Sequence, residues 1–258
     1  MTYDHLTLEF EPRLAVVRLH RPAVRNALSQ ALMQELTQCA QALAERTDID
    51  VVILTGDSTC FTAGADLKDA RSWADASLPL VTRRHLAGLG YRMCKAWEAL
   101  PQVSIVAIEG YAVGGGLALS LACDWRVLAD DAWVSLPEIA LGIPLTWGTI
   151  PRLVNLLGPA RAKRLTILCE RIAAPEALAM GLVDHTAPKG QALPAARELA
   201  ARTLAMPAAA VRMSKESVNA VATALNHAAG HMAHDQIALA AASGEAAAAR
   251  AQALRQRS

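Results

Sequence analysis

The chain has 258 residues, 53% of them hydrophobic and 19% charged, and its 25 basic and 24 acidic side chains leave a formal charge of +1. A chain of this length buries about 70% of its open-chain surface on folding, which is enough for one large core. The near-neutral balance, without a block of Lys or Arg, argues against nucleic acid or an anionic membrane as a main partner, because both require a concentrated positive field.

The sequence offers no sign of a membrane span or a secretory signal. The longest apolar run, Gly110 to Cys123, is shorter than the roughly 20 residues that a spanning helix needs. The first ten residues carry Asp4 and Glu9 and lack an apolar stretch, so we expect a cytoplasmic protein. The five cysteines occur singly, without a Cys-x-x-Cys pair, which favours reduced, buried thiols over disulfides or zinc ligands.

The N-terminal part of the chain predicts a β-hairpin followed by a helix. Leu6 to Phe10 and Leu14 to Leu19 are typical of short strands on either side of a turn that contains Pro12. Ser29 is a favourable N-cap residue, and the apolar residues after it have the spacing of one face of a helix that runs to about Arg46. The residues of this stripe are Leu32, Leu36, Cys39 and Leu43.

Two continuous apolar runs predict a sheet that is covered by helices. Val51 to Thr55 and Ser104 to Ile108 are apolar on almost every residue, as expected for strands that are buried on both faces. Between these strands we expect a loop from Leu67 onward and then a helix at about Leu89 to Leu100. The alternation of strands and helices is typical of an α/β fold.

A second unit repeats the order of the first. Gly114 to Gly116 lead into a short apolar helix that ends near Asp124, and short strands follow at Trp125 to Leu128 and Trp133 to Ser135. Strand, glycine turn and buried helix occur in the same order around Gly64. We therefore expect two similar units that stack on each other.

The C-terminal part of the chain has a different composition. From about Gly190 the sequence is rich in Ala and other helix formers, and no strand-like run remains. Pro188 to Gly190 is the expected boundary. We therefore predict a mixed core over residues 1–189 and a helical module over residues 190–258.

Two segments place glycine and small residues directly after a buried strand. Phe61 to Leu67 and Gly110 to Gly116 each lead into a helix, so their free N–H groups can point at an oxygen that becomes negative. Two such ends could converge on one oxyanion, or each glycine could simply permit a tight turn. The third glycine of a dinucleotide-binding loop, the Lys of a phosphate loop and the Gly-x-Ser-x-Gly of a nucleophile elbow are all missing.

Glu138 is a lone carboxylate in a long apolar passage. Such a group usually faces solvent or forms an ion pair. If the side chain is half-buried instead, desolvation raises its pKa toward the value that general acid–base catalysis requires. Glu138 is therefore the best candidate for a residue that carries a proton.

His227, His231 and His234 have a spacing that puts three imidazoles on one helix face. The group could hold a metal, but Gly230 interrupts the helix and no glutamate follows the first histidine as in zinc proteases. We therefore expect a solvated or subunit-facing stripe and no metal site.

With these motifs in place, the sequence resembles the enoyl-CoA hydratase/isomerase, or crotonase, superfamily. The resemblance implies an α/β fold, a crotonase-like spiral of stacked ββα units with a C-terminal helical trimerisation module, assembled as a homotrimer or a dimer of trimers. The segments that carry it follow the family order over about residues 10–190, and they are Arg25–Ser29, Phe61–Lys68, Gly110–Asp124, Pro137–Gly142 and Glu176–Val183.

The resemblance also implies an acyl-CoA substrate and the residues that bind it. The N–H groups of Ala65 and Gly115 would form the oxyanion hole for the thioester carbonyl, and Glu138 would be the acid–base group. No cofactor is implied beyond the coenzyme A of the thioester. The remaining substrate-binding residues would be Arg25, Ala27, Ala63, Asp66, Leu67, Lys68 and Gly114.

The sequence departs from the hydratase pattern at two places. Typical hydratases hold a water between two glutamates, but here Ala118 replaces the first of them and only Glu138 remains. A single base suffices to move a double bond, so we favour isomerisation, with single-glutamate hydration or a catalytically weak acyl-CoA-binding protein as alternatives. The second departure is Trp147, which could wall the acyl pocket or simply fill the core.

Overall fold

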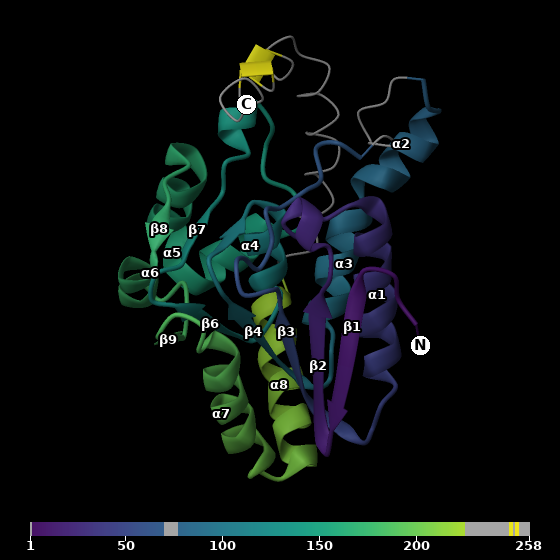
Figure 1. The fold of residues 1–258 in the computed structure, drawn as a ribbon, viewed down its shortest axis with the longest axis vertical. Helices are drawn as coiled ribbons and strands as arrows, with labels where there is room; N and C mark the ends of the chain where they lie inside the picture. Colours follow the sequence, from purple (N-terminus) through teal and green to yellow (C-terminus); the bar gives the residue numbers. More distant parts are fainter. Residues whose placement is uncertain (1, 70–76, 225–247, 250, 253–258) are drawn as a thin grey trace.

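The fold contains two β-sheets (Figure 1). In two places the chain runs from a strand of the large sheet to a strand of the small sheet and then into a helix. The computed structural model describes residues 2–69, 77–224, 248–249 and 251–252. The large sheet has the order β1-β2-β3-β4-β6-β9, in which only β1 is antiparallel to its neighbour. Its strands are β1 (Leu6–Glu11), β2 (Arg13–Leu19), β3 (Ile49–Thr55), β4 (Val103–Ile108), β6 (Trp125–Ala129) and β9 (His185–Ala187).

The predicted hairpin and first helix are confirmed. β1 and β2 pair antiparallel, with Leu6 opposite Leu19. The helix α1 (Gln30–Ala44) begins directly after Ser29, whose hydroxyl accepts a hydrogen bond from the Leu32 N–H at 3.3 Å. The apolar stripe of α1 is buried, because it packs against α3 (Leu89–Glu98).

Helices cover the central strands of the large sheet. Val51 to Leu54 are fully buried although successive strand residues point to opposite faces, so both faces of β3 are covered. The helix α7 (Ala192–Leu204) packs against β3, β4 and β6, while α1 and α3 lie on the other side of the sheet (Figure 1). The predicted buried strands are thus confirmed.

The small sheet explains the stacked units. It consists of β5 (Tyr111–Val113), β7 (Trp133–Ser135) and β8 (Ile172–Ala173). The chain runs from β4 to β5 and then into α4 (Gly115–Ser120), and from β6 to β7 before α5 (Thr149–Leu168). This repetition of ββα units confirms the expected spiral. The sequence predicts the residues of β5 only as part of a glycine turn. They form a strand because Tyr111 to Val113 pair in parallel with β7.

A helix also occupies part of the expected loop. The helix α2 (Leu80–Ala87) precedes α3, with Arg84 and His85 in its last turn. None of its residues is buried, so the helix has no apolar stripe of the kind that made α1 predictable. Trp73, which belongs to the expected loop by its position, lies outside the described residues.

The remaining helices follow β8. They are α6 (Ala174–Met180), α7 and α8 (Ala208–Thr223). Ala192, Ala196 and Ala200 of α7 are fully buried in the same core as β3 and β4, so the first helix beyond the expected boundary shares that core. The division into residues 1–189 and 190–258 stays a prediction. In the part of the chain that the structure describes, no helix has the length and apolar character needed to cross a membrane.

Candidate active site

The two glycine-containing segments of the sequence lie side by side. Thr62 and Ala112 form a parallel bridge, and the N–H of Val113 donates to the carbonyl of Thr62 at 3.2 Å. This bridge continues the small sheet beyond β5. Because the pairing is parallel, the residues after Thr62 and those after Ala112 leave the sheet in the same direction.

Glycine is required at the turn of each segment. Gly64 has φ +87° and Gly114 has φ +55°, a region that other residues rarely adopt. A Cβ on Gly64 would lie 2.5 Å from the carbonyl oxygen of Val113 and 3.5 Å from the nitrogen of Gly115. The first turn is thus in contact with the backbone of the second, and no larger residue fits between them.

The N–H groups of Ala65 and Gly115 follow these two glycines directly. In the bridge between Leu28 and Ala65, the N–H of Leu28 donates to the carbonyl of Gly64, and the N–H of Asp66 donates to the carbonyl of Leu28. The N–H of Ala65 is not used by this bridge. Gly115 is the first residue of α4. Its N–H therefore has no acceptor within the helix and lies at the positive end of the helix dipole.

Glu138 is held beside the second turn by β7. The N–H of Gly114 donates to the carbonyl of Ser135 at 2.8 Å, and the chain then reaches Glu138 through Pro137. The residue starts a short 3₁₀ turn, η2 (Ile139–Leu141). A Cβ on Gly114 would lie 2.7 Å from Oε1 of Glu138, so the carboxyl group lies directly over this glycine.

The carboxyl group of Glu138 is buried and only partly satisfied. Its Oε2 atom is inaccessible to solvent and has no hydrogen-bond partner among the described residues. Burial raises the pKa of Glu138 to about 7, because desolvation penalises the charged form. A carboxyl group with this pKa can both accept and return a proton near neutral pH.

Trp147 packs against the same turn. Its indole lies so close to the Cα atoms of Gly90 and Gly115 that a Cβ on either glycine would overlap the ring. A cavity of about 70 Å³ lies beside the indole. This cavity is lined by Leu28, Gln30, Met33, Ala65, Asp66, Asp69, Leu86, Ala87, Gly90 and Trp147.

The residues expected along CoA lie on two neighbouring stretches of chain. The N–H of Ala63 donates to the carbonyl of Arg25 at 3.0 Å, and Ala27 is buried immediately before the bridge to Ala65. Leu67 is half-buried and Lys68 is exposed. The stretch 25–28 thus lies beside the stretch 63–66.

Asp66 has a role that the sequence did not reveal. Its Oδ2 accepts from Nη1 of Arg21 at 3.1 Å, and both side chains are largely buried. The same guanidinium donates to the carbonyl of Ala27. Arg21 therefore fixes the loop that carries Ala65, although it stands 45 residues before Asp66 and no motif marks it.

Two further sets of predicted positions are Ala118 and the three C-terminal histidines. Ala118 is buried in α4, one turn after Gly114, so no carboxylate stands at this position of the helix. His227, His231 and His234 lie outside the described residues. Within residues 2–69 and 77–224, no group of three His, Cys, Asp or Glu side chains could hold a metal ion.

A larger cavity lies elsewhere in the molecule. It has a volume of about 760 Å³ and separates α8 from the N-terminal ends of β4 and β6 and from α5. Its lining includes Glu98, Asp124, Arg152 and Lys215, whereas Glu138 and both glycine turns do not line it. Of the predicted site residues, Ala65, Asp66 and Trp147 line the smaller cavity instead.

Fold and site together define a class of protein. Two units in which the chain passes from the large sheet to the small sheet before a helix, with two glycine turns meeting beside a buried carboxyl group, are features of the crotonase fold.

Comparison with known proteins assigns the family. The family model described as enoyl-CoA hydratase/isomerase matches residues 9–247. The chain is 34% identical over 220 residues to a crotonyl-CoA hydratase of Syntrophomonas wolfei, covering 85% of this chain and 83% of the relative. It is 38% identical over 208 residues to a putative enoyl-CoA hydratase/isomerase of Bacillus subtilis, covering 80% and 78%. The chain therefore belongs to the enoyl-CoA hydratase/isomerase family.

A solved structure supports the same assignment. The fold superimposes on the crystal structure of an enoyl-CoA hydratase from Bacillus anthracis with a TM-score of 0.79. The two chains are 34% identical, and the match covers 92% of this chain and 90% of the other. The protein is thus an enzyme of this family, whose substrates are acyl-CoA thioesters.

Proposed function

We propose that the protein isomerises enoyl-CoA thioesters, with Glu138 as the single acid–base group and the N–H groups of Ala65 and Gly115 as the oxyanion hole. The observation that carries this proposal is the buried Oε2 of Glu138 above the second glycine turn, which has no hydrogen-bond partner among the residues that the structure describes. In this site Ala118 takes the place of a second carboxylate.

The oxyanion hole supplies the step that family members share. When a proton leaves C2 of the acyl group, negative charge develops on the thioester oxygen. Two N–H groups fixed by the backbone bind this oxygen without rearrangement, and loss of one such donor typically costs about 3–4 kcal/mol. Both donors follow glycines with positive φ, Gly64 and Gly114. Because the donors are main-chain groups, the side chains at 65 and 115 take no part in the reaction.

Glu138 then determines the reaction. A carboxylate above the turn removes a proton from C2 and returns it at C4, which moves the double bond from C3 to C2. The reaction needs no second base. A pKa of about 7 leaves the group ready for both directions of proton transfer.

Hydration of a 2-enoyl-CoA is the second candidate. It is favoured by the relatives, since the protein from Syntrophomonas wolfei is named a crotonyl-CoA hydratase. Hydration requires a water to be positioned and deprotonated while C2 receives a proton, and two carboxylates achieve this better than one. With Ala118 in place, we expect hydration to be slower than isomerisation.

The binding residues and the assembly follow the family pattern. Arg25, Ala27, Ala63, Leu67 and Lys68 line the path for CoA. Asp66 contributes through its position rather than its charge, because its carboxylate is paired with Arg21. No cofactor is needed besides the CoA of the thioester, and we expect a homotrimer or a dimer of trimers in the cytoplasm.

The experiment offers a 2-enoyl-CoA and a 3-enoyl-CoA to the pure protein and follows both products. A shifted double bond supports isomerisation, and 3-hydroxyacyl-CoA supports hydration. Glu138→Gln should abolish C2 proton exchange in a bound acyl-CoA while CoA affinity stays within about twofold, since glutamine keeps the shape but cannot accept the proton. Glu216→Gln, an exposed position on α8, is the matched control. Unchanged exchange in Glu138→Gln would exclude this residue from the mechanism.

A further inference from the structure

Trp147 stands between the second glycine turn and α3. Its indole contacts Gly115, whose N–H belongs to the proposed oxyanion hole, and Gly90 on α3. Both contacts require glycine, because a Cβ at either position would overlap the ring. The ring is therefore held between two helices, α3 and the start of α4.

The cavity beside Trp147 is small. It reaches from Ala65 to the indole and has a volume of about 70 Å³. This is room for a few groups of the size of water, each of which occupies about 30 Å³ in the liquid. Leu28, Met33 and Leu86 make most of its wall apolar, as suits a hydrocarbon chain.

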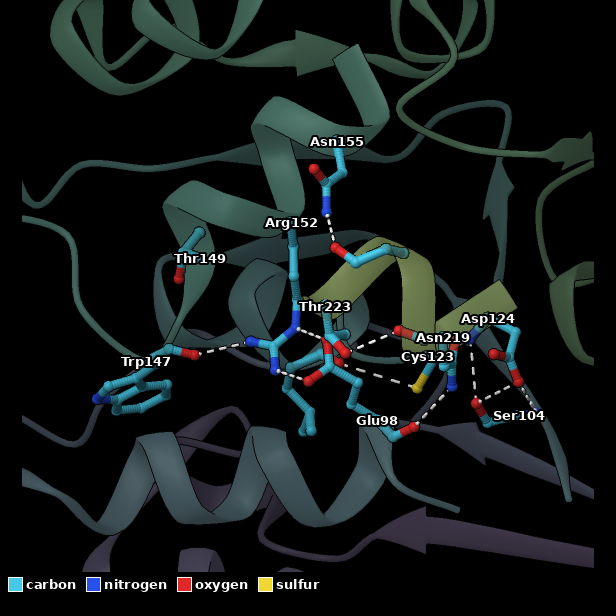
Figure 2. Close-up of polar contacts among 12 residues, drawn as sticks. Glu98, Ser104, Cys123, Asp124, Trp147, Thr149, Arg152, Asn155, Asn219 and Thr223 are labelled. Carbon is cyan, nitrogen blue, oxygen red and sulfur yellow. Dashed lines mark hydrogen bonds and ion pairs between the residues drawn. The ribbon is translucent and has the colours of Figure 1, made fainter. Parts of the chain in front are cut away.

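The backbone of Trp147 is anchored by a buried ion pair. Arg152, which is 8% exposed, donates from Nη1 to the carbonyl of Trp147 at 2.9 Å (Figure 2). The same guanidinium makes a bidentate pair with the carboxylate of Glu98, at 2.8 and 2.9 Å. Glu98 is the last residue of α3, so the anchor joins α3 to α5.

The anchor holds a backbone that tryptophan does not favour. Trp147 has φ +59° and Gly148 has φ +71°, both in the left-handed region. Such a conformation costs a non-glycine residue free energy and persists only where its surroundings hold it. A Cβ on Gly148 would lie 2.8 Å from Nη1 of Arg152, so this glycine allows the guanidinium to reach the carbonyl.

We propose that Trp147, positioned by the Arg152–Glu98 pair, closes the acyl end of the site and restricts the enzyme to short acyl chains. The proposal rests on the proposed function, because it takes the N–H groups at Ala65 and Gly115 as the place of the thioester carbonyl. Trp147 is the specificity-determining residue, and Arg152 and Glu98 are positioning residues that do not touch the substrate.

The test compares Trp147→Ala with the wild type by calorimetric binding of butyryl-CoA and octanoyl-CoA. Wild type should bind butyryl-CoA at least tenfold more tightly than octanoyl-CoA. The variant should shift this ratio toward octanoyl-CoA by about tenfold or more, since each buried methylene contributes a factor of about four. Trp125→Ala, which removes a tryptophan at the larger cavity, is the matched control and should leave the ratio unchanged.

A second variant tests the anchor. Arg152→Gln removes the hydrogen bond to Trp147 and leaves Glu98 without its ion-pair partner. It should therefore shift the affinity ratio of butyryl-CoA to octanoyl-CoA in the same direction as Trp147→Ala. Arg152→Lys should restore part of the discrimination. Lower stability with an unchanged ratio would overturn the positioning role. An unchanged ratio in a folded Trp147→Ala protein would overturn the specificity role.

The outcomes separate this inference from the proposed function. If wild type discriminates between the two saturated ligands through Trp147 but converts no enoyl-CoA, the function fails and the inference stands. If wild type turns over enoyl-CoA but Trp147→Ala leaves the ratio unchanged, the inference fails alone. If no acyl-CoA binds, both fail.

Discussion

Glu138 is the residue at which stability and reactivity conflict. Its Oε2 is buried without a partner in the described structure, which is unfavourable for an ionised carboxylate. A water-exposed glutamate at this position would cost less, but it would have the ordinary acidity of a carboxyl group. The elevated pKa is thus a direct consequence of the burial that places the group over Gly114.

The pH dependence of proton exchange follows from this pKa. Only the ionised carboxylate accepts the C2 proton, and burial raises the pKa of Glu138 to about 7. The rate of exchange, measured as kcat/KM, should therefore rise with pH through about 7 and level off above pH 8, with about a tenth of the maximum left at pH 6. A midpoint near 4.5, the ordinary value for a glutamate, would contradict the burial of this group.

The stability of the protein should show the opposite trend for the same residue. The pKa of Glu138 is about 7 when folded and near 4.5 when unfolded, so the folded state binds more protons between these values. The contribution of Glu138 to the free energy of unfolding therefore falls as pH rises from 4.5 to 7. Glu138→Gln should stabilise the protein by about 1–3 kcal/mol at pH 8 and by much less at pH 5.

Urea unfolding at the two pH values measures this difference. Glu216→Gln serves again as the control, because its exposed side chain should change stability by less than about 0.5 kcal/mol at either pH. An equal effect of Glu138→Gln at pH 5 and pH 8 would contradict the assigned pKa.

Among the elements, α7 depends on a carboxylate from another part of the chain. Glu109, which is 8% exposed, accepts from the N–H groups of Gly190 and Ala192 at 3.0 and 2.9 Å. It therefore caps the start of α7 and lies near the positive end of its dipole. This contact joins the strand β4 region to the helix that covers the sheet.

Loss of this cap should destabilise the fold without altering the site. Glu109→Ala should lower the free energy of unfolding by about 1–2 kcal/mol, which corresponds to a decrease of about 2–8 °C in Tm for a chain of this size. The exposed Glu198→Ala on the same helix is the control. Calorimetric unfolding of both variants measures the decrease. If Glu109→Ala and Glu198→Ala have the same Tm, the cap contributes nothing to stability.

The sequence predicted the elements whose pattern is local. The stripe of α1, the continuous apolar runs of β3 and β4, the glycine turns and the apolar surroundings of Glu138 can each be recognised within a short segment of sequence. The strand β5 has three residues and depends on pairing with β7, and the exposed α2 has no apolar stripe. Arg152 and Glu98 lie 54 residues apart, so nothing in either local sequence marks them as partners.

On the scale of the whole molecule, most of the thiols are buried. Cys39, Cys60, Cys94 and Cys123 are buried and free, whereas Cys169 is partly accessible. Burial raises the pKa of Cys94 and that of Cys123 to about 12, so neither forms a reactive thiolate in the folded protein. The expectation that the thiols are buried is confirmed for four of the five.

Thiol labelling therefore reports unfolding of the entire core. With a thiol-specific disulfide reagent at pH 8, the native protein should react rapidly at Cys169 only, and the other four should react at the rate of global unfolding. Cys169→Ser should remove the fast phase. Rapid labelling of a second cysteine in that variant would show that part of the core opens on its own.

The hydrogen-bond donors of the proposed site belong to the main chain, at the turns made by Gly64 and Gly114. Replacing the side chain of a neighbouring residue leaves the peptide N–H in place unless the new residue is proline. Divergence of such a protein toward new chemistry can therefore proceed through substitutions at 118, 138 and 147 while the anion-binding scaffold is inherited intact.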